Sequence, residues 1–205
     1  MSLIEEYRGQ ITALKDIGGL FYDRGWSVGT SSNYSIVVSR EPYRLLITAS
    51  GKDKGRLNDT DFVLVDAHGK IIEGQPEQPS AETLLHVMAT RNTTVNSVLH
   101  THSVWATVLS DLFHEKGAVE IEGYEMLKGL AGITTHDTKV SIDIFENTQD
   151  IPTLAMKLEQ SLPRYGFLLR RHGLYSWGKD VFEARRHIEV IEFLLEVIYR
   201  QRLSV

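Results

Sequence analysis

The segment from Val95 to Phe113 reads VNSVLHTHSVWATVLSDLF. An apolar run ends in two histidines, His100 and His102, and a helical pattern begins at Ser103. Short apolar runs are typical of buried strands, and apolar residues spaced three and four apart are typical of helices. The segment therefore predicts a strand followed by a helix, with polar side chains where the two meet.

Similar patterns extend on both sides of this segment. Alternating or continuous apolar runs predict strands at 34–39, 44–48, 62–66 and 165–173, and a turn at 67–70 leads into a hairpin. Apolar periodicity predicts helices at 3–21, at 80–91, from about 151, and at 180–202. The region 116–145 has no clear period. Helices alternate with strands, but the early hairpins argue against a purely parallel sheet, so we predict a layered α/β fold with a mixed sheet.

Composition limits the class of protein. The 205 residues contain no internal repeat or linker, and their length is that of one domain spanning 1–205. A net charge of −5 argues against a nucleic-acid partner. Without cysteine, the chain has no disulfide or thiolate zinc site. Acids near the N-terminus and the lack of a long apolar run predict a cytoplasmic protein with no membrane span.

The two histidines of the opening segment have the spacing of metal ligands. On a strand, residues i and i+2 point to the same face, with Cα atoms about 6.5–7 Å apart. A catalytic zinc typically takes three protein ligands, and His172 is the best third candidate because it also follows an apolar strand. Spacing alone leaves open that they are polar residues at the end of a buried strand.

The other histidines lack this geometry. They are interpreted as turn, surface or core residues: His68, His86, His114, His136 and His187. His86 lies four residues after Glu82 on the same predicted helical face, so it could also support a site from behind.

Three stretches contain small polar residues that suit an anion. GTSSNYSI at 29–36 enters a strand, ITASGKDKG at 47–55 leaves one, and Ser80 opens the predicted helix of PSAE. Hydroxyls, backbone N–H groups and helix N-termini are donors that bind phosphate. Each stretch alone is also an ordinary turn sequence.

Taken together, the motifs GTSSN, TASGKDKG, PSAET, HTHS and RRHGLYSWG resemble the class II aldolase/adducin family, from about Leu14 to Leu203. The resemblance implies a three-layer α/β/α sandwich with a largely antiparallel central sheet. It also implies a cyclic homotetramer with sites near subunit interfaces. It implies that His100, His102 and His172 hold one zinc ion. The residues implied to face a substrate phosphate are Ser31, Ser32, Asn33, Ser50, Gly51 and Ser80.

Within the family, YEMLKGLAG at 124–132 resembles a segment of the enzymes that dehydrate 5-methylthioribulose 1-phosphate in methionine salvage. The resemblance implies that Glu125 removes the C3 proton from a substrate polarised by zinc, and that the C4 hydroxyl then leaves. Tyr124 departs from that pattern, where those enzymes have Gln. Without the resemblance, Glu125 is interpreted as a surface acid.

Three alternatives remain at this point. Glu82 matches the acid/base of the family's aldolases, which would break C3–C4 instead, and 4-epimerisation of a ketose phosphate is a related variant. An adducin-like binding module would have no catalytic metal, although three histidines argue against it.

Iron, cobalt or manganese would also suit an all-histidine site. Candidate contacts for the methylthio group are Phe113, Met126 and Leu127.

Overall fold

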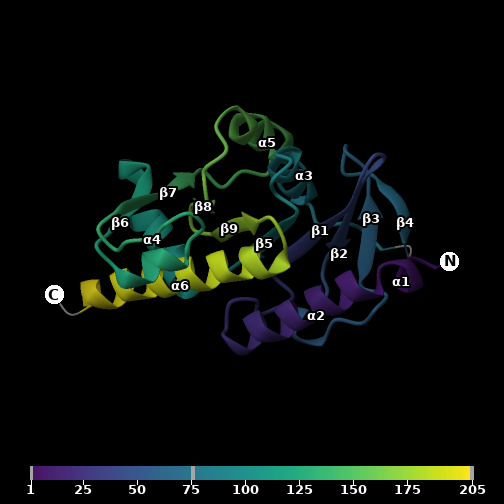
Figure 1. The fold of residues 1–205 in the computed structure, drawn as a ribbon, viewed down its shortest axis with the longest axis horizontal. Coiled ribbons are helices and arrows are strands. Elements are labelled where there is room, and N and C mark those ends of the chain that lie inside the picture. The colour runs from purple at the N-terminus through teal and green to yellow at the C-terminus, as the bar shows by residue number, and fades with distance from the viewer. Residues whose placement is uncertain (1, 75–76, 204–205) are drawn as a thin grey trace.

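The computed structural model describes residues 2–74 and 77–203. Within this part of the chain, one sheet has the strand order β4-β3-β2-β1-β5-β9-β8-β7-β6. Every neighbouring pair is antiparallel except β7 and β8, which are parallel. The prediction of a mixed sheet is confirmed. Because β5 and β9 are adjacent near the middle, the sheet brings together segments more than 70 residues apart (Figure 1).

The strands are β1 (Asn33–Arg40), β2 (Tyr43–Thr48), β3 (Phe62–Val65), β4 (Ile71–Gly74), β5 (Ser97–Thr101), β6 (Ala118–Glu122), β7 (Lys139–Phe145), β8 (Gly166–Leu169) and β9 (Gly173–Gly178). The helices are α1 (Leu3–Glu6), α2 (Arg8–Asp23), α3 (Thr83–Arg91), α4 (Val104–Leu112), α5 (Ile151–Gln160) and α6 (Val181–Leu203). Short 3-10 turns are η1 (Lys54–Arg56), η2 (His114–Lys116) and η3 (Glu125–Gly129).

Helices cover both faces of the sheet. On one face, α2, α4 and α6 pack their apolar sides into one large cluster with the strands. On the other face, α3 and α5 pack against β5, β8 and β9, and α3 also reaches β2 and β3. Figure 1 shows α3 and α5 on one side of the sheet and α2 and α6 on the other. The three-layer arrangement is therefore confirmed.

The N-terminal prediction of one helix is wrong in detail. The capping box between Ser2 and Glu5 is present, but it starts a helix of only four residues. Tyr7 has φ −114°, which is not helical, and α2 begins after it. The Tyr7 side chain is buried in the core, and this packing accompanies the break.

The helix predicted from Ser80 begins later, at Thr83. Ser80 instead forms a turn ahead of it, since its hydroxyl accepts from the Glu82 N–H at 3.2 Å and its carbonyl accepts from the Thr83 N–H at 3.1 Å. Glu82 has φ −94° and ψ 9° and occupies the N-cap position. Its side chain makes no capping bond, so the carboxylate is available elsewhere.

The segment around His172 also differs from the prediction. The strand expected to end at His172 ends at Leu169, and a second strand, β9, follows immediately. All six residues of β9 are buried, so the segment lacks the alternation that reveals a half-exposed strand. The uncertain region 116–145 contains β6, η3 and β7. No helix in the described chain is long and apolar enough to cross a membrane.

Candidate metal centre and phosphate cradle

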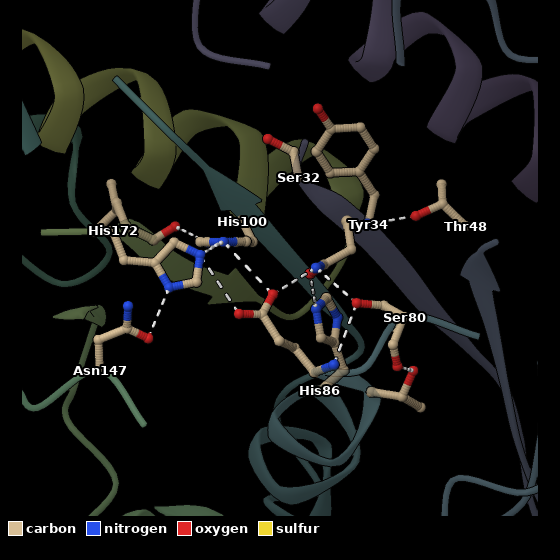
Figure 2. Close-up of polar contacts among 12 residues, drawn as sticks. Ser32, Tyr34, Thr48, Ser80, His86, His100, Asn147 and His172 are labelled. Atoms are coloured by element: carbon tan, nitrogen blue, oxygen red, sulfur yellow. Dashed lines mark hydrogen bonds and ion pairs between the residues drawn. The ribbon is translucent and has the colours of Figure 1, made fainter. Parts of the chain in front are cut away.

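Three histidines converge at the end of the central strands. His100 is on β5, His102 lies just beyond it, and His172 is in the turn between β8 and β9. One nitrogen from each ring lies within 4.8 Å of the other two. The Nε2 atoms of His100 and His172 are 3.3 Å apart, and Figure 2 shows these two nitrogens pointing toward each other. The predicted cluster is present, although His102 is not on the strand itself.

Pairing between β5 and β9 places these rings. Thr101 is opposite Leu174 in the antiparallel register, so the turn carrying His172 lies beside the end of β5. Gly173 permits the close approach, because a Cβ at that position would be 2.0 Å from the Thr101 carbonyl oxygen. The His102 N–H donates to the Trp26 carbonyl at 2.7 Å, which directs the chain out of the strand.

The hydrogen bonds of the rings leave nitrogen lone pairs pointing into the cluster. The Nδ1–H of His100 donates to the Leu174 carbonyl at 2.9 Å, so its Nε2 is unprotonated in the neutral ring. The Nδ1 of His172 faces the Asn147 side-chain oxygen at 3.3 Å, which favours the same tautomer. Three imidazoles fit the ligand set of a catalytic zinc, and partners on the far nitrogens, as His100 and His172 have here, fix ligand orientation.

Electrostatics keep the His100 and His102 rings neutral. Burial, together with the neighbouring imidazoles, holds the pKa of His100 well below its ordinary value. Burial, His172 and the charge of Lys54 lower the pKa of His102 to about 4. Neutral imidazole is the metal-binding form, so protons do not compete with a metal for these two rings near pH 7.

Glu82 lies beside the cluster. Its Oε2 is 3.7 Å from the His100 Nε2, and its Oε1 is 3.5 Å from the His172 Nε2. The Asn33 amide donates to Oε2 at 2.9 Å and to the Ser80 hydroxyl at 3.0 Å. A carboxylate held next to three potential metal ligands is placed to exchange a proton with a substrate bound there.

His86 supports Glu82 through Asn33. The ring is fully buried, and its Nε2–H donates to the Asn33 side-chain oxygen at 2.5 Å. Its Nδ1 accepts from the Ser35 hydroxyl at 2.7 Å, and burial lowers its pKa to about 3, so the ring stays neutral. This chain fixes the amide so that the NH₂ group faces Glu82. Its position four residues after Glu82 was the sequence signal for this role.

Tyr175 was missed by the sequence analysis. Its ring stacks on His100 with centroids 3.9 Å apart and an interplanar angle of 11°. Burial and the charge of Glu82 raise the pKa of its phenol well above the ordinary value. The signal was hidden because β9 itself was not predicted.

The three candidate phosphate-binding stretches come together around Asn33. Asn33 is opposite His100 in the β1–β5 register. Ser50 N–H donates to the Gln78 carbonyl at 2.9 Å, and Ala49 bridges to Pro79, which joins the Ser50–Gly51 turn to the Ser80 turn. Ser31 and Ser32 precede Asn33 on the remaining loop. We call the loops 29–33 and 50–54, together with Ser80, the cradle.

Glu125 does not lie with the histidines of its own chain. It is exposed on η3, where its carboxylate pairs with Lys128 and lies 3.5 Å from the Nδ1 of His136. The hydrogen bond from Lys128 lowers its pKa. Leu127 is fully buried in the core, so it cannot contact a substrate at this site.

The remaining histidines serve other purposes. His68 and His136 are exposed, and His114 pairs with Glu146 at 2.9 Å. His187 is buried between the Trp177 carbonyl and the Ala131 N–H, at 2.7 and 3.1 Å. These placements agree with their interpretation as turn, surface or core residues.

This fold is that of class II aldolase-type structures. The sequence profile described as "Class II Aldolase and Adducin N-terminal domain" matches residues 12–199, and the chain belongs to that family. Two L-fuculose 1-phosphate aldolase structures superpose with TM-scores of 0.77 and 0.75 at 22% and 23% identity. The first match covers 95% of this chain and 86% of the other, and the second, from Thermus thermophilus, covers 96% and 97%.

Curated relatives are more similar in sequence. The methylthioribulose-1-phosphate dehydratase of Marinobacter nauticus is 43% identical over 198 residues, covering 94% of each chain. The protein of the same name from Pectobacterium atrosepticum is 48% identical over 201 residues, covering 95% of each chain.

Proposed function

We propose that the chain is a hydro-lyase that converts 5-methylthioribulose 1-phosphate into 2,3-diketo-5-methylthiopentyl 1-phosphate in methionine salvage. The names of relatives at 43% and 48% identity, each matched over nearly its full length, supply the substrate and the reaction. The observation that carries the chemistry is the convergence of three imidazoles with the Glu82 carboxylate beside them.

The proposed metal ligands are His100, His102 and His172, holding one zinc ion per subunit. When bound, the metal would supply Lewis-acid polarisation of the substrate carbonyl. The Leu174 carbonyl beside His100 and the Asn147 side-chain oxygen beside His172 favour the tautomer whose Nε2 faces the cluster with a lone pair.

Dehydration requires one proton to leave C3 and one to reach the departing C4 hydroxyl. The electrons of the C3–H bond form a double bond between C3 and C4. The C4 hydroxyl is protonated and leaves as water, and the resulting enol tautomerises to the diketone. We assign the same-chain acid/base role to Glu82, whose Oε2 is held by Asn33. Glu125 remains the second proposed catalytic residue, and it can act only on the site of a neighbouring subunit because it lies elsewhere on its own chain.

The cradle is proposed to bind the substrate phosphate through Ser31, Ser32, Asn33, Ser50, Gly51 and Ser80. Gly29, Thr30, Ser32 and Gly51 have φ between 64° and 71°, a backbone that can turn consecutive N–H groups toward one anion. We further propose a homotetramer, a single domain over 1–205 and a cytoplasmic location. The single sheet that runs through the described chain supports the domain proposal.

A ketose-1-phosphate aldolase is the second candidate, because Glu82 occupies a position beside the cluster from which it could deprotonate a C4 hydroxyl. That reaction would break the C3–C4 bond and leave the C4 oxygen in an aldehyde.

Mass spectrometry of the products separates these reactions. Zinc-loaded protein is incubated with 5-methylthioribulose 1-phosphate, and the expected product is lighter by one water with its carbon chain intact. Release of dihydroxyacetone phosphate would instead establish aldol cleavage. Unchanged substrate, with zinc bound, would contradict both reactions on this compound. Protein that stays empty after zinc loading would favour a binding module without a catalytic metal.

A further inference from the structure

Lys54 is a buried lysine within the cradle. Its side chain is almost entirely inaccessible, with 1% of the residue exposed. The ammonium donates to the Thr30 carbonyl at 3.3 Å and to the Lys52 carbonyl at 2.8 Å. Lys54 therefore joins the two loops of the cradle from the inside.

The Lys54 backbone is fixed by α2. Gly18 packs so closely on it that an added Cβ would be 2.3 Å from the Lys54 carbonyl oxygen. Asp53 caps the turn by accepting from the Gly55 N–H at 3.0 Å. The ammonium is consequently held in place by the fold and does not depend on a flexible surface loop.

This ammonium has no carboxylate in contact within residues 2–74 and 77–203. Lys52, two residues earlier, pairs with Asp61 at 3.3 Å and Glu77 at 2.9 Å, whereas the contacts of Lys54 are two neutral carbonyls. Asp53 and Asp61 act on it only at longer range, and burial lowers its pKa to about 8. An ammonium has three N–H donors, so one remains for a further acceptor. A buried cation without an anion is unfavourable, which indicates that an anion completes this site.

Two neighbours show where that anion would lie. The Ser31 hydroxyl is buried and, among the described residues, has no hydrogen-bond partner. Ser31 directly follows Thr30, whose carbonyl accepts from the Lys54 ammonium, and Asn33 on the same loop is opposite His100 in the β1–β5 register. The unused donors of Lys54 and Ser31 thus belong to the loop that leads to the strand position beside His100.

We propose that Lys54 is the cation that binds the substrate phosphate, donating its third N–H to a phosphate oxygen alongside the Ser31 hydroxyl. The Lys54 ammonium would neutralise part of the negative charge of the phosphate. The serine hydroxyls and backbone N–H groups are neutral and only donate hydrogen bonds to it. The inference rests on the proposed function in one respect, namely that the substrate carries a phosphate.

The test uses inorganic phosphate and metal-free protein, so that phosphate cannot coordinate zinc. Isothermal titration calorimetry would measure the phosphate dissociation constant of the wild type, Lys54→Met and Lys54→Arg. Loss of one charge-assisted hydrogen bond is expected to weaken phosphate binding by about 10- to 100-fold in Lys54→Met. Lys54→Arg retains the charge and should bind phosphate more tightly than Lys54→Met.

Lys15→Met is the matched control, because its ammonium lies outside the cradle and pairs with Asp59 at 2.5 Å. It should change the phosphate dissociation constant less than threefold. Circular dichroism checks folding, and if Lys54→Met does not fold, Lys54→Gln takes its place, since its amide can still donate to a loop carbonyl. A folded neutral variant that binds phosphate as the wild type does would overturn the proposal. That result is independent of turnover, so it is distinct from failure of the proposed reaction.

Discussion

The Glu82 carboxylate and the three imidazoles show how residues of little individual specificity define one site. His100 and His102 had the spacing of ligands, and their rings are 4.4 Å apart between centroids. Glu82 lies beside them because a turn at Ser80 delays the start of α3, which places Glu82 at the N-cap position. Its side chain makes no capping hydrogen bond to the helix. Residue types indicate which side chains can form the site, and local backbone conformation determines where those side chains point.

Loss of a ligand should release the metal. His100→Ala removes one of three imidazoles and is expected to weaken zinc binding by at least about 100-fold, with activity lost in parallel. Competition with a chromophoric chelator measures the affinity. The exposed His68→Ala is the matched control. Full zinc content and activity in His100→Ala would contradict the assignment of the ligands.

Loss of the neighbouring carboxylate should separate chemistry from metal binding. Glu82→Gln keeps an oxygen that can accept from Asn33 but cannot take up a proton. We expect kcat to fall by about 10²-fold or more while zinc affinity stays within threefold. A Glu82→Gln variant with wild-type kcat would show that another group exchanges the proton.

Glu192 should give the stability of the protein a distinct pH dependence. Its fully buried carboxyl accepts from the Thr101 hydroxyl and from the Trp105 indole at 2.6 Å, and burial raises its pKa to about 7. Between the ordinary pKa of Glu and 7, the folded state holds a proton that the unfolded state has released. The Glu192 contribution to the free energy of unfolding therefore falls as pH rises through this window and levels off above it.

Glu192→Gln removes this contribution. Urea denaturation of both proteins is measured from pH 4.5 to 7.5. As pH rises, the free energy of unfolding of the variant should increase relative to that of the wild type, by up to about 3 kcal/mol. The difference between the two proteins isolates Glu192 from the buried histidines, whose lowered pKa values act in the opposite direction. A difference that does not change with pH would refute the raised pKa.

At the scale of elements, the hairpin formed by β8 and β9 is what completes the site. It carries His172 and lays Tyr175 against His100. The sequence predicted β1, β2, β3 and β5 closely because their apolar runs end at turns. It missed β9, because a fully buried strand bounded by glycines has no period of two and resembles a turn.

The closeness of β5 and β9 can be tested at Gly173. An added Cβ would lie 2.0 Å from the Thr101 carbonyl oxygen and 3.2 Å from His100 Cε1. Gly173→Ala should lower the free energy of unfolding by about 1–3 kcal/mol and weaken zinc binding. In α2, Gly19 has open space at the same position, so Gly19→Ala should instead stabilise by about 0.5–1 kcal/mol. Equal effects of the two substitutions in urea denaturation would argue against steric strain at β5.

At the scale of the whole molecule, the sheet separates the two proposed catalytic acids. Glu82 precedes α3 on one face, whereas Glu125 lies on η3, whose Gly129 packs against Val190 of α6 on the other face. Figure 1 shows α3 and α6 on opposite sides of the sheet. If both acids act on one substrate, two subunits must share each site.

Mixed oligomers test this sharing. His100→Ala and Glu125→Gln are each expected to be inactive alone. Unfolding and refolding them as a 1:1 mixture should restore about one quarter of wild-type activity, because that share of sites combines an intact cluster with an intact neighbouring Glu125. His100→Ala mixed with Glu82→Gln is the control, since both residues belong to the same chain's site and no activity should return. Absence of restoration in the first mixture would place Glu125 outside the active site.

The sequence by itself determined the mixed α/β pattern, the three histidines and the small polar loops suited to an anion. These features depend on residue type and short spacing, which a linear chain displays directly. Family resemblance added the layered arrangement, the sugar-phosphate substrate and the catalytic roles of Glu82 and Glu125.

Only the tertiary structure decided which of these residues meet. The β5–β9 pairing brings His172 to His100 across more than 70 residues, and the sheet keeps Glu125 away from the cluster of its own chain. Lys54 and Glu192 look like ordinary surface charges in the sequence, yet both are buried. Burial and long-range pairing arise from packing of distant segments, and that packing decides which polar groups are left with unused donors and shifted pKa values.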